Sequence, residues 1–352
     1  IIVTYRPTER TLSSMQLSIL IIATALLGHS CAAQEERPLP FSFLDDLTLS
    51  HGFQLSAVES SMSPIEVGAI LVADAQEQPK WRLAQWGTRF SLESAQEQSL
   101  TDGTRLMKNQ GKQIKILPGG LADQGVYLEV NAGTEYGEEL RQYNESWPHL
   151  LIEQYLTRRP LHEFESLEFN LEFLVKKCDV TTEKPLNPGL HTAQITAYWT
   201  IHNVNKESPD YNDMIWFGIP LYDVRYPIPR GHQAVDVGQE NATGKFIFTL
   251  DGERFYKRPV SIGKWHTLAC DLVPLIREAL AASQSKGFLM DTTYEDLTAT
   301  SFNLGWEVPG PYHCAITLRK LHLLGYTDVE KKVLCQELLH NGLDKVQHFL
   351  AP

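Results

Sequence analysis

The sequence predicts an all-β protein: an antiparallel β-sandwich with one inserted helix and a short helical C-terminal tail. Short segments rich in aromatic and β-branched residues, bounded by Gly, Asn or Pro, follow one another from residue 81 to residue 326. Only one segment in this range has the period of an amphipathic helix, and no long linker or internal repeat interrupts the series. Many strands with a single helix favour a sandwich over a parallel α/β fold.

The segment at residues 166–175, "SLEFNLEFLV", has the clearest period of two. Because side chains on a strand alternate between its faces, the apolar and polar residues of this segment separate. The apolar face consists of Leu167, Phe169, Leu171, Phe173 and Val175, and the polar face of Glu168, Asn170 and Glu172. This pattern predicts a half-buried strand of an antiparallel sheet.

Residues 193–203, "AQITAYWTIHN", alternate in the same way, with Trp199 on the apolar face and Tyr198 on the polar face. The other predicted strands are residues 81–93, 113–119, 125–131, 245–252, 264–270, 301–308 and 312–326. From this parity we expect eight side chains to be buried between the sheets: Phe169, Leu171, Phe173, Ile195, Trp199, Ile201, Leu304 and Trp306.

The predicted helix covers residues 271–287. Asp271 stands at the N-cap position, Pro274 lies in the first turn and Gly287 stops the helix. Residues 327–352 are predicted to form one or two short amphipathic helices after the last strand.

The ends of the chain predict a secreted or cell-surface protein. Residues 1–14 precede the first methionine, Met15, and we treat them as an upstream extension. Residues 15–33 read as a signal peptide with cleavage after Ala33, since the apolar run at 17–28 is too short to span a bilayer comfortably. A buried apolar helix and a lipid anchor at Cys31 are the alternatives. Residues 34–326 then form a single domain.

Four cysteines follow the predicted cleavage site. Cys178, Cys270, Cys314 and Cys335 allow three complete pairings, among which the sequence does not choose. Buried free thiols are the alternative. Their spacing does not match a zinc site.

The chain carries a net charge of −12, and its Lys and Arg residues are scattered along the sequence. A protein that binds phosphate backbones needs a cationic footprint. We therefore expect neither nucleic acid nor an anionic lipid surface as a partner.

Three stretches carry a resemblance to known proteins: "SFNLGWEVPGPYHCAITLRKLHLLGY", "YNDMIWFGIPLYDVRY" and "SWPHLLIEQ". They resemble strands of secreted jelly-roll and concanavalin-like sandwiches of carbohydrate-active proteins, over roughly residues 130 to 326. The resemblance implies a concave sheet that holds a glycan, with no required cofactor but often a structural calcium ion. Two known catalytic patterns are missing: the E-x-D-x-x-E strand of retaining glucanases, and the Q-[IV]-H strand of alginate-lyase-type sandwiches, for which "QIT" at 194–196 is the nearest match.

The polar faces of the predicted strands are candidates for binding a glycan, because a sugar needs hydrogen-bonding groups and aromatic platforms. The predicted ligand-binding residues are Gln194, Tyr198, His202, Glu172, Asn170 and Glu307, with Trp216, Tyr222 and Arg225 at the rim. Asp223 and Asp236 are candidate calcium ligands, although Asp223 and Arg225 equally suit a structural ion pair. A plain solvated sheet face is the alternative to the whole site.

We weigh four functions. The first is a polysaccharide-binding protein without catalysis. The second is a polysaccharide lyase, in which Tyr198 or His202 removes the proton and Arg225 or Gln194 neutralises a uronate carboxylate. The third is a glycoside hydrolase that uses two of three acids: Glu168, Glu172 and Glu307. The fourth is a structural or adhesive protein with no sugar site. His149 and Glu153, which share a strand face, form a further candidate acid–base couple.

Overall fold

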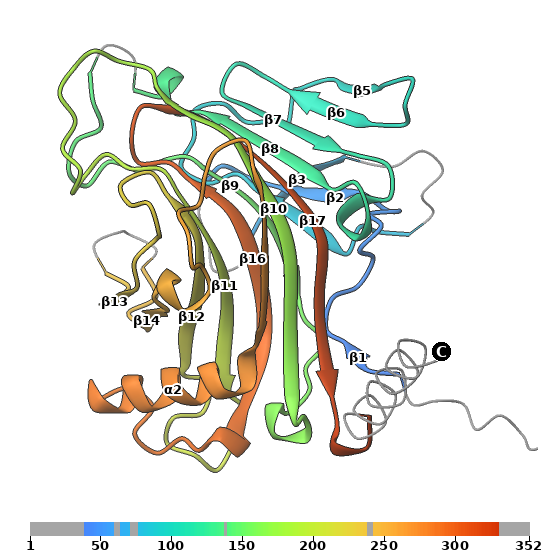
Figure 1. Cartoon of the computed structure of the whole chain (residues 1–352), viewed down its shortest axis with the longest axis vertical. Helices are drawn as coiled ribbons and strands as arrows, with labels where there is room; N and C mark the ends of the chain where they lie inside the picture. Colours follow the sequence, from blue (N-terminus) through green and yellow to red (C-terminus); the bar gives the residue numbers. More distant parts are fainter. Residues whose placement is uncertain (1–38, 60–63, 71–76, 137–138, 238–241, 331–352) are drawn as a thin grey trace, which may run out of the picture. The chain divides into compact units, whose positions relative to one another are not determined.

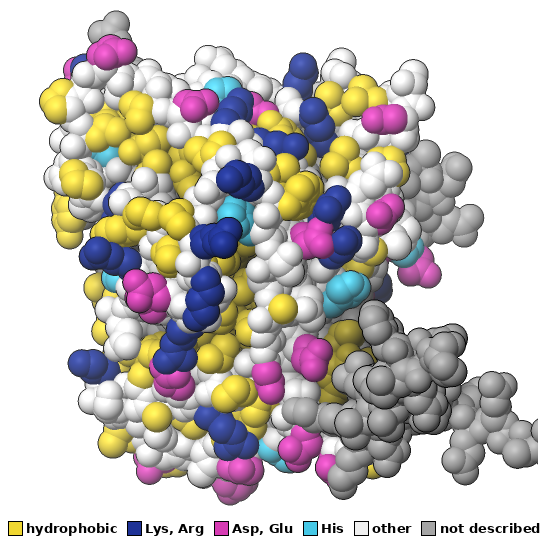
Figure 2. Space-filling model, viewed as in Figure 1, with side chains coloured by type: hydrophobic (Ala, Val, Ile, Leu, Met, Phe, Trp, Pro, Cys, Tyr) yellow, Lys and Arg dark blue, Asp and Glu magenta, His cyan; other side chains and the backbone are white. Residues whose placement is uncertain are grey.

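The chain is described here from a computed structural model, which describes residues 39–59, 64–70, 77–136, 139–237 and 242–330. The predicted β-sandwich is confirmed: two large, mostly antiparallel sheets enclose one hydrophobic cluster to which both contribute (Figure 1). Figure 2 shows the outside of the molecule from the same side, where charged side chains are spread among apolar ones.

The two longest strands of the eight-stranded sheet are neighbours within it. Its order is β15 (Trp265–Asp271), β10 (Ser166–Val180), β17 (Tyr312–Tyr326), β8 (Val126–Asn131), β7 (Lys112–Ile116), β6 (Arg105–Lys108) and β5 (Glu97–Ser99), and β1 (Phe41–Ser42) also pairs with β17. β17 therefore lies between β10 and β8, although it follows every other strand of the sheet in sequence.

The nine-stranded sheet carries the face that the sequence singles out. Its order is β13 (His232–Val235), β14 (Phe246–Thr249), β12 (Met214–Asp223), β11 (Gln194–Asn203), β16 (Leu297–Glu307), β9 (His149–Tyr155), β4 (Trp81–Ala84), β2 (Phe53–Ser56) and β3 (Glu66–Ile70). Two of its pairs, β12 with β14 and β2 with β4, are parallel. The short 3-10 helices are η1 (Gly120–Ala122), η2 (Ala132–Thr134), η3 (Leu161–Glu163), η4 (Gly252–Arg254) and η5 (Tyr294–Asp296).

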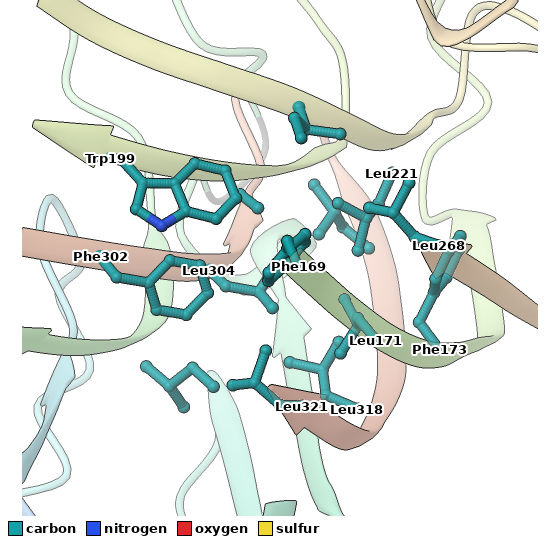
Figure 3. Packing of buried hydrophobic residues seen from close by; sticks show 14 of the residues in the cluster. Phe169, Leu171, Phe173, Trp199, Leu221, Leu268, Phe302, Leu304, Leu318 and Leu321 are labelled. Carbon is teal, nitrogen blue, oxygen red and sulfur yellow. The ribbon is translucent and has the colours of Figure 1, made fainter. Parts of the chain in front are cut away.

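The core confirms the predicted parity. All eight side chains expected between the sheets are at most 1% exposed. Trp199 of β11 meets Phe169 of β10 edge to face, with ring centroids 4.8 Å apart, so the two sheets interlock at this contact (Figure 3). Such aromatic contacts add to the hydrophobic stabilisation that burial of these large rings provides.

A β-bulge changes the parity of β12. Ile195 of β11 lies opposite Tyr222, but Thr196 lies opposite Pro220, so Leu221 is the extra residue. The bulge turns Tyr222 toward the core, where its ring meets Trp306 edge to face at 6.0 Å. The expectation that Tyr222 lies at the rim of a glycan site is therefore wrong.

The predicted helix is also confirmed, as α2 (Leu272–Ser285), which belongs to neither sheet and packs against β10, β12 and β14. Figure 1 shows it lying across one end of the long strands. The Asp271 carboxylate accepts hydrogen bonds from the N–H groups of Val273, at 3.0 Å, and Leu167, at 2.9 Å. It thus caps the helix and ties the helix to the start of β10.

Removing this cap gives a moderate, measurable loss of stability. We expect Asp271→Ala to lower the free energy of unfolding by about 1–2 kcal/mol, because the two amide donors lose their acceptor. Glu93→Ala, at an exposed position, serves as the control. Equal urea midpoints for the two variants would contradict the capping role.

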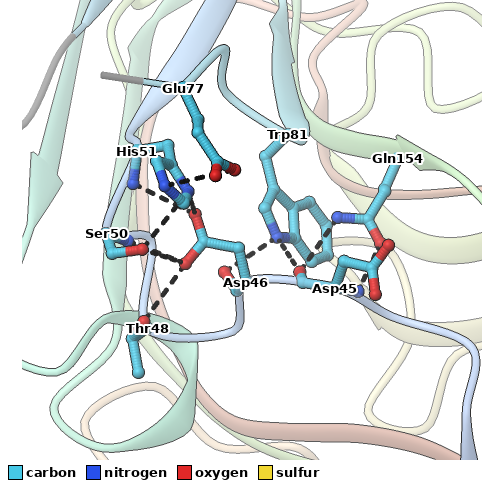
Figure 4. A network of polar contacts seen from close by, with 8 residues as sticks. All are labelled: Asp45, Asp46, Thr48, Ser50, His51, Glu77, Trp81 and Gln154. Carbon is cyan, nitrogen blue, oxygen red and sulfur yellow. Dashed lines mark hydrogen bonds and ion pairs between the residues drawn. The ribbon is translucent and has the colours of Figure 1, made fainter. Parts of the chain in front are cut away.

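The segment before β2 is fixed by a polar network (Figure 4). The Trp81 indole donates to the Asp45 carbonyl at 2.8 Å, and the Gln154 side chain bonds both the N–H and the carbonyl of Asp45. Burial raises the pKa of the Asp46 carboxyl, but hydrogen bonds from Ser50 and His51 outweigh burial and leave it below its usual value. This network joins the N-terminal segment to β4 and β9.

Several predictions from the sequence lie outside the described residues: the extension at 1–14, the signal peptide at 15–33 with Cys31, Cys335, and all but the start of the tail. Residues 328–330 begin a helical turn. No helix within the described ranges is long and apolar enough to cross a membrane.

Candidate functional site

The candidate site is the outer face of the nine-stranded sheet, which we define as the side chains of β12, β11, β16, β9 and β4 that point away from the core. The antiparallel register places these side chains in rows that run across the strands. Two rows are polar and aromatic, and a row of small or apolar residues separates them: Thr196, Gly305, Leu151 and Ala84.

The first row brings an amide, a carboxylate and an imidazole together. Gln194, Glu307 and His149 lie opposite one another on β11, β16 and β9. The Gln194 amide donates to the Glu307 carboxylate at 3.4 Å, and Nε2 of His149 lies 3.8 Å from that carboxylate. Nδ1 of His149 lies 3.0 Å from the Trp147 carbonyl, which fixes the orientation of the ring.

Two indoles flank this row. The Trp147 ring stacks on His149 with centroids 5.7 Å apart, and the Trp86 ring lies 6.0 Å from it at a tilt. Both indoles are partly exposed. The guanidinium of Arg141 lies over the Trp147 ring at 5.1 Å, so this loop is held by a cation–π contact.

The second row begins with Tyr198 of β11, and the Trp216 ring of the next row lies beside it. Tyr198 of β11 lies over Gly218 of β12, where a Cβ atom would come within 2.5 Å of the Tyr198 ring. Trp216 meets Tyr198 edge to face at 6.3 Å, and its indole N–H donates to Oγ1 of Thr243 at 3.1 Å. Gly218 therefore makes room for an aromatic pair lying across the sheet.

The second row continues with Asn303, Glu153 and Arg82 on β16, β9 and β4. Glu153 and Arg82 form a tight ion pair, and both side chains are about nine-tenths buried. Burial raises the pKa of Glu153 in spite of the hydrogen bond from Arg82. The exposed Tyr155 ring lies under the Arg82 guanidinium at 5.2 Å and ends the polar surface on β9.

The lyase interpretation needs an available base, and both candidate side chains take part in local hydrogen bonds. Burial raises the pKa of Tyr198, whose hydroxyl pairs with Oγ1 of Thr249 at 3.1 Å. Burial lowers the pKa of His202, whose Nδ1 pairs with Oγ1 of Thr300 at 2.7 Å. Tyr198 and His202 do lie on the outer face, as parity predicts, but within local hydrogen bonds.

Three predicted residues belong elsewhere. Glu168, Asn170 and Glu172 lie on β10, in the opposite sheet, and Glu172 is paired there with Arg319 and Lys320. The expectation that Glu172 shares a groove with Tyr198 is wrong, because the hydrophobic core lies between the two sheets. The same separation excludes a hydrolase that combines Glu307 with Glu168 or Glu172, whose carboxylates must flank one bond.

The rim and calcium predictions also change. Asp223 accepts two hydrogen bonds from Arg225, at 2.9 and 2.6 Å, which is the structural ion pair foreseen as the alternative. Asp236 accepts a hydrogen bond from Thr243, which lies beside Trp216. Trp216 is seven residues from Asp223 along β12, which corresponds to about 23 Å. The two carboxylates are too far apart to share an ion, and the described part of the chain contains no group of three or more acidic, His or Cys residues able to hold a metal.

The predicted acid–base couple of His149 and Glu153 does not form, because each side chain has a different partner. His149 faces Glu307, and Glu153 faces Arg82. Sequence reasoning missed Arg82, Trp86, Trp147 and Tyr155 as members of this surface. Only Tyr155 had a usable signal, since it continues the parity of His149 and Glu153.

Described residues also line two depressions outside the two polar rows, one of which includes Thr249, the partner of Tyr198. One, of about 250 Å³, lies between β13, η4 and α2, and the other, of about 350 Å³, lies beside Tyr136 and Thr181. Neither includes a residue of the two polar rows.

No protein-family model and no curated protein matches this chain. Solved structures with similar folds include a cellulase derived from Cel12A of Rhodothermus marinus, with 14% identity, 65% of this chain and 95% of that chain covered, and a TM-score of 0.33. The family 12 xyloglucanase of Bacillus licheniformis has 13% identity, 65% and 98% coverage, and a TM-score of 0.34. The family 11 xylanase of Neocallimastix patriciarum has 11% identity, 66% and 95% coverage, and a TM-score of 0.31. At these values no conclusion about activity follows.

Proposed function

We propose that the outer face of the nine-stranded sheet binds a polysaccharide. The observation that carries the proposal is the occurrence of aromatic rings and hydrogen-bonding groups in neighbouring rows of one sheet face. Trp216 and Tyr155 present rings, while Gln194, Glu307 and Asn303 present amide and carboxylate groups. Sugars combine apolar C–H faces with many hydroxyls, so both kinds of group contribute to binding.

Binding without cleavage is favoured over hydrolysis by the positions of the two acids on this face. Glu307 lies opposite His149, and Glu153 lies four residues farther along β9, or about 13 Å. Retaining glycosidases hold their carboxyl groups about 5 Å apart and inverting ones roughly 6.5–9.5 Å. Each carboxylate is also bonded to a neighbouring side chain: Glu307 to Gln194, and Glu153 to Arg82.

Two variants test the proposal. We expect Trp216→Ala and Tyr155→Ala each to weaken binding to a retained polysaccharide roughly fivefold to tenfold, since each removes a stacking surface worth about 1 kcal/mol. Affinity electrophoresis against neutral and acidic polysaccharides measures the effect. Tyr211→Ala removes a comparably exposed ring from the turn between β11 and β12 and should leave retention unchanged.

Two results would overturn the proposal. Lack of retention of the wild type on every polysaccharide would remove the proposed function. Release of reducing ends by the wild type, lost in Glu307→Gln with binding preserved, would replace binding alone by hydrolysis.

A further inference from the structure

Two loops lie against each other at one edge of the sandwich: residues 224–231, after β12, and residues 252–264, before β15. We call them the basic loop pair. The N–H of Val260 donates to the Pro227 carbonyl at 2.8 Å, and the N–H of Gly252 donates to the Pro229 carbonyl at 2.9 Å. Val260 and Tyr256 are buried in the core, which fixes the loops to the domain.

The charge of the basic loop pair is opposite to that of the whole protein. The two loops contain six basic residues and one acidic residue, Glu253, in a chain with a net charge of −12. The basic residues are Arg225, Arg230, Arg254, Lys257, Arg258 and Lys264. The fold therefore brings the cations of two separate segments together.

Four of these cations have no carboxylate partner among the residues that the structure describes. Arg225 pairs with Asp223, and Arg254 pairs with Glu278. The four others are exposed and form no such pair: Arg230, Lys257, Arg258 and Lys264. Unpaired cations in this density favour an anionic partner.

Two aromatic rings near the loops each have a guanidinium on one face, although the Trp265 ring is still 40% exposed. The guanidiniums of Arg230 and Arg225 lie over the Tyr226 ring, at 4.4 and 5.3 Å, and Arg319 lies over Trp265 at 3.9 Å. Binding of single-stranded nucleic acid uses free ring faces for its bases, and membrane docking uses free apolar side chains. The surface offers positive charge and guanidinium donors, with Ile262 and Trp265 as its exposed large apolar side chains.

We infer that the basic loop pair binds the carboxylate or sulfate groups of an acidic polysaccharide that continues from the outer face. This inference rests on the proposed function. β12 ends at Asp223, which lies directly opposite Gln194, so the loops begin at the end of the first polar row. Guanidinium groups match carboxylate and sulfate oxygens in geometry as well as charge.

The experiment compares polymers that differ only in charge: carboxymethyl cellulose with hydroxyethyl cellulose, and dextran sulfate with dextran. We expect the wild type to bind the charged member of a pair more tightly, with an affinity that falls as salt is added. The double variant Lys257→Glu/Arg258→Glu should lose roughly tenfold or more in affinity for that charged polymer, because two charge-assisted contacts become repulsive. Its affinity for any neutral polysaccharide that binds should stay unchanged.

A matched control makes the same change of charge outside the loops. Lys206→Glu/Lys286→Glu alters two exposed lysines and should retain the wild-type affinity, with thermal unfolding confirming that both double variants fold. Equal affinities of the wild type and the loop variant for the charged polymers would overturn the inference and leave the proposed function standing. Loss of binding to every polysaccharide by the wild type would remove both. Binding to oligodeoxythymidine or phosphatidylserine vesicles that is tighter than to the charged polymers, and is lost in the loop variant, would replace the polysaccharide as the partner.

Discussion

Oxidation that joins Cys178 to Cys314 is expected to raise the free energy of unfolding by about 2–4 kcal/mol. These residues lie directly opposite each other on β10 and β17, with their Sγ atoms 3.3 Å apart, and are separated by 136 residues in sequence. A bond across so long a loop restricts the unfolded chain strongly, and the chain-entropy relation gives about 5 kcal/mol as an upper figure.

The oxidant is a small disulfide such as oxidised glutathione, which takes up the two electrons and two protons released by the thiols. Burial raises the pKa of the Cys314 thiol far above its usual value, so exchange in the folded protein is slow. We therefore expect the bond to form during refolding. Urea unfolding with and without reductant, together with peptide mass mapping, measures the effect.

Cys270→Ala is the control, because Cys270 has no neighbouring thiol among the described residues. Its stability should depend on reductant as that of the wild type does, whereas the dependence should vanish in Cys314→Ala. A bridge mapped to Cys270 or Cys335, or identical stabilities in both redox states, would refute the pairing.

The stability of the protein is also expected to rise with pH above about 7 through Lys112. Its side chain is 2% exposed, and its amino group donates to the Phe90 carbonyl at 2.8 Å. Burial lowers the pKa of Lys112 to about 7, and the nearby Glu135 only partly opposes the effect. Between this pH and about 10.4, the unfolded chain holds a proton at Lys112 that the folded chain has released.

Because the unfolded state binds more protons in this range, the free energy of unfolding increases with pH, by up to roughly 1.4 kcal/mol per unit. We expect the advantage of the wild type over Lys112→Met to grow by a few kcal/mol between pH 7 and 10. Lys115→Met, on the same strand but partly exposed, should follow the wild-type curve. Parallel pH curves for the wild type and Lys112→Met would contradict a buried neutral amine.

Parity in the sequence was enough to predict which side of a strand is buried. Trp199 and Tyr198 take opposite faces of β11 as predicted, because the alternation of side chains is a property of one strand. The N-cap at Asp271 was equally local. Both signals lie within a few residues, so they need no knowledge of which strands become neighbours.

The composition of the candidate site depended on information that one strand does not contain. Glu172 and Gln194 come from consecutive strands, yet the chain crosses from one sheet to the other between them. His149 meets Glu307 only because β9 pairs with β16, across more than 150 positions of sequence. Tyr222 was misplaced by a single extra residue in β12, which shifts every later side chain to the opposite face.

The position of β17 has a consequence for synthesis of the protein. Both β10 and β8 use β17 as a neighbour, and β1 pairs with it from the other end of the domain, Phe41 with Gly325. While a ribosome is still translating residues 312–326, the eight-stranded sheet has no centre, and the edges of β10 and β8 remain open to other chains. Such long-range pairing slows folding and exposes nascent strands to aggregation. Folding of this sheet is thus expected only after translation of β17.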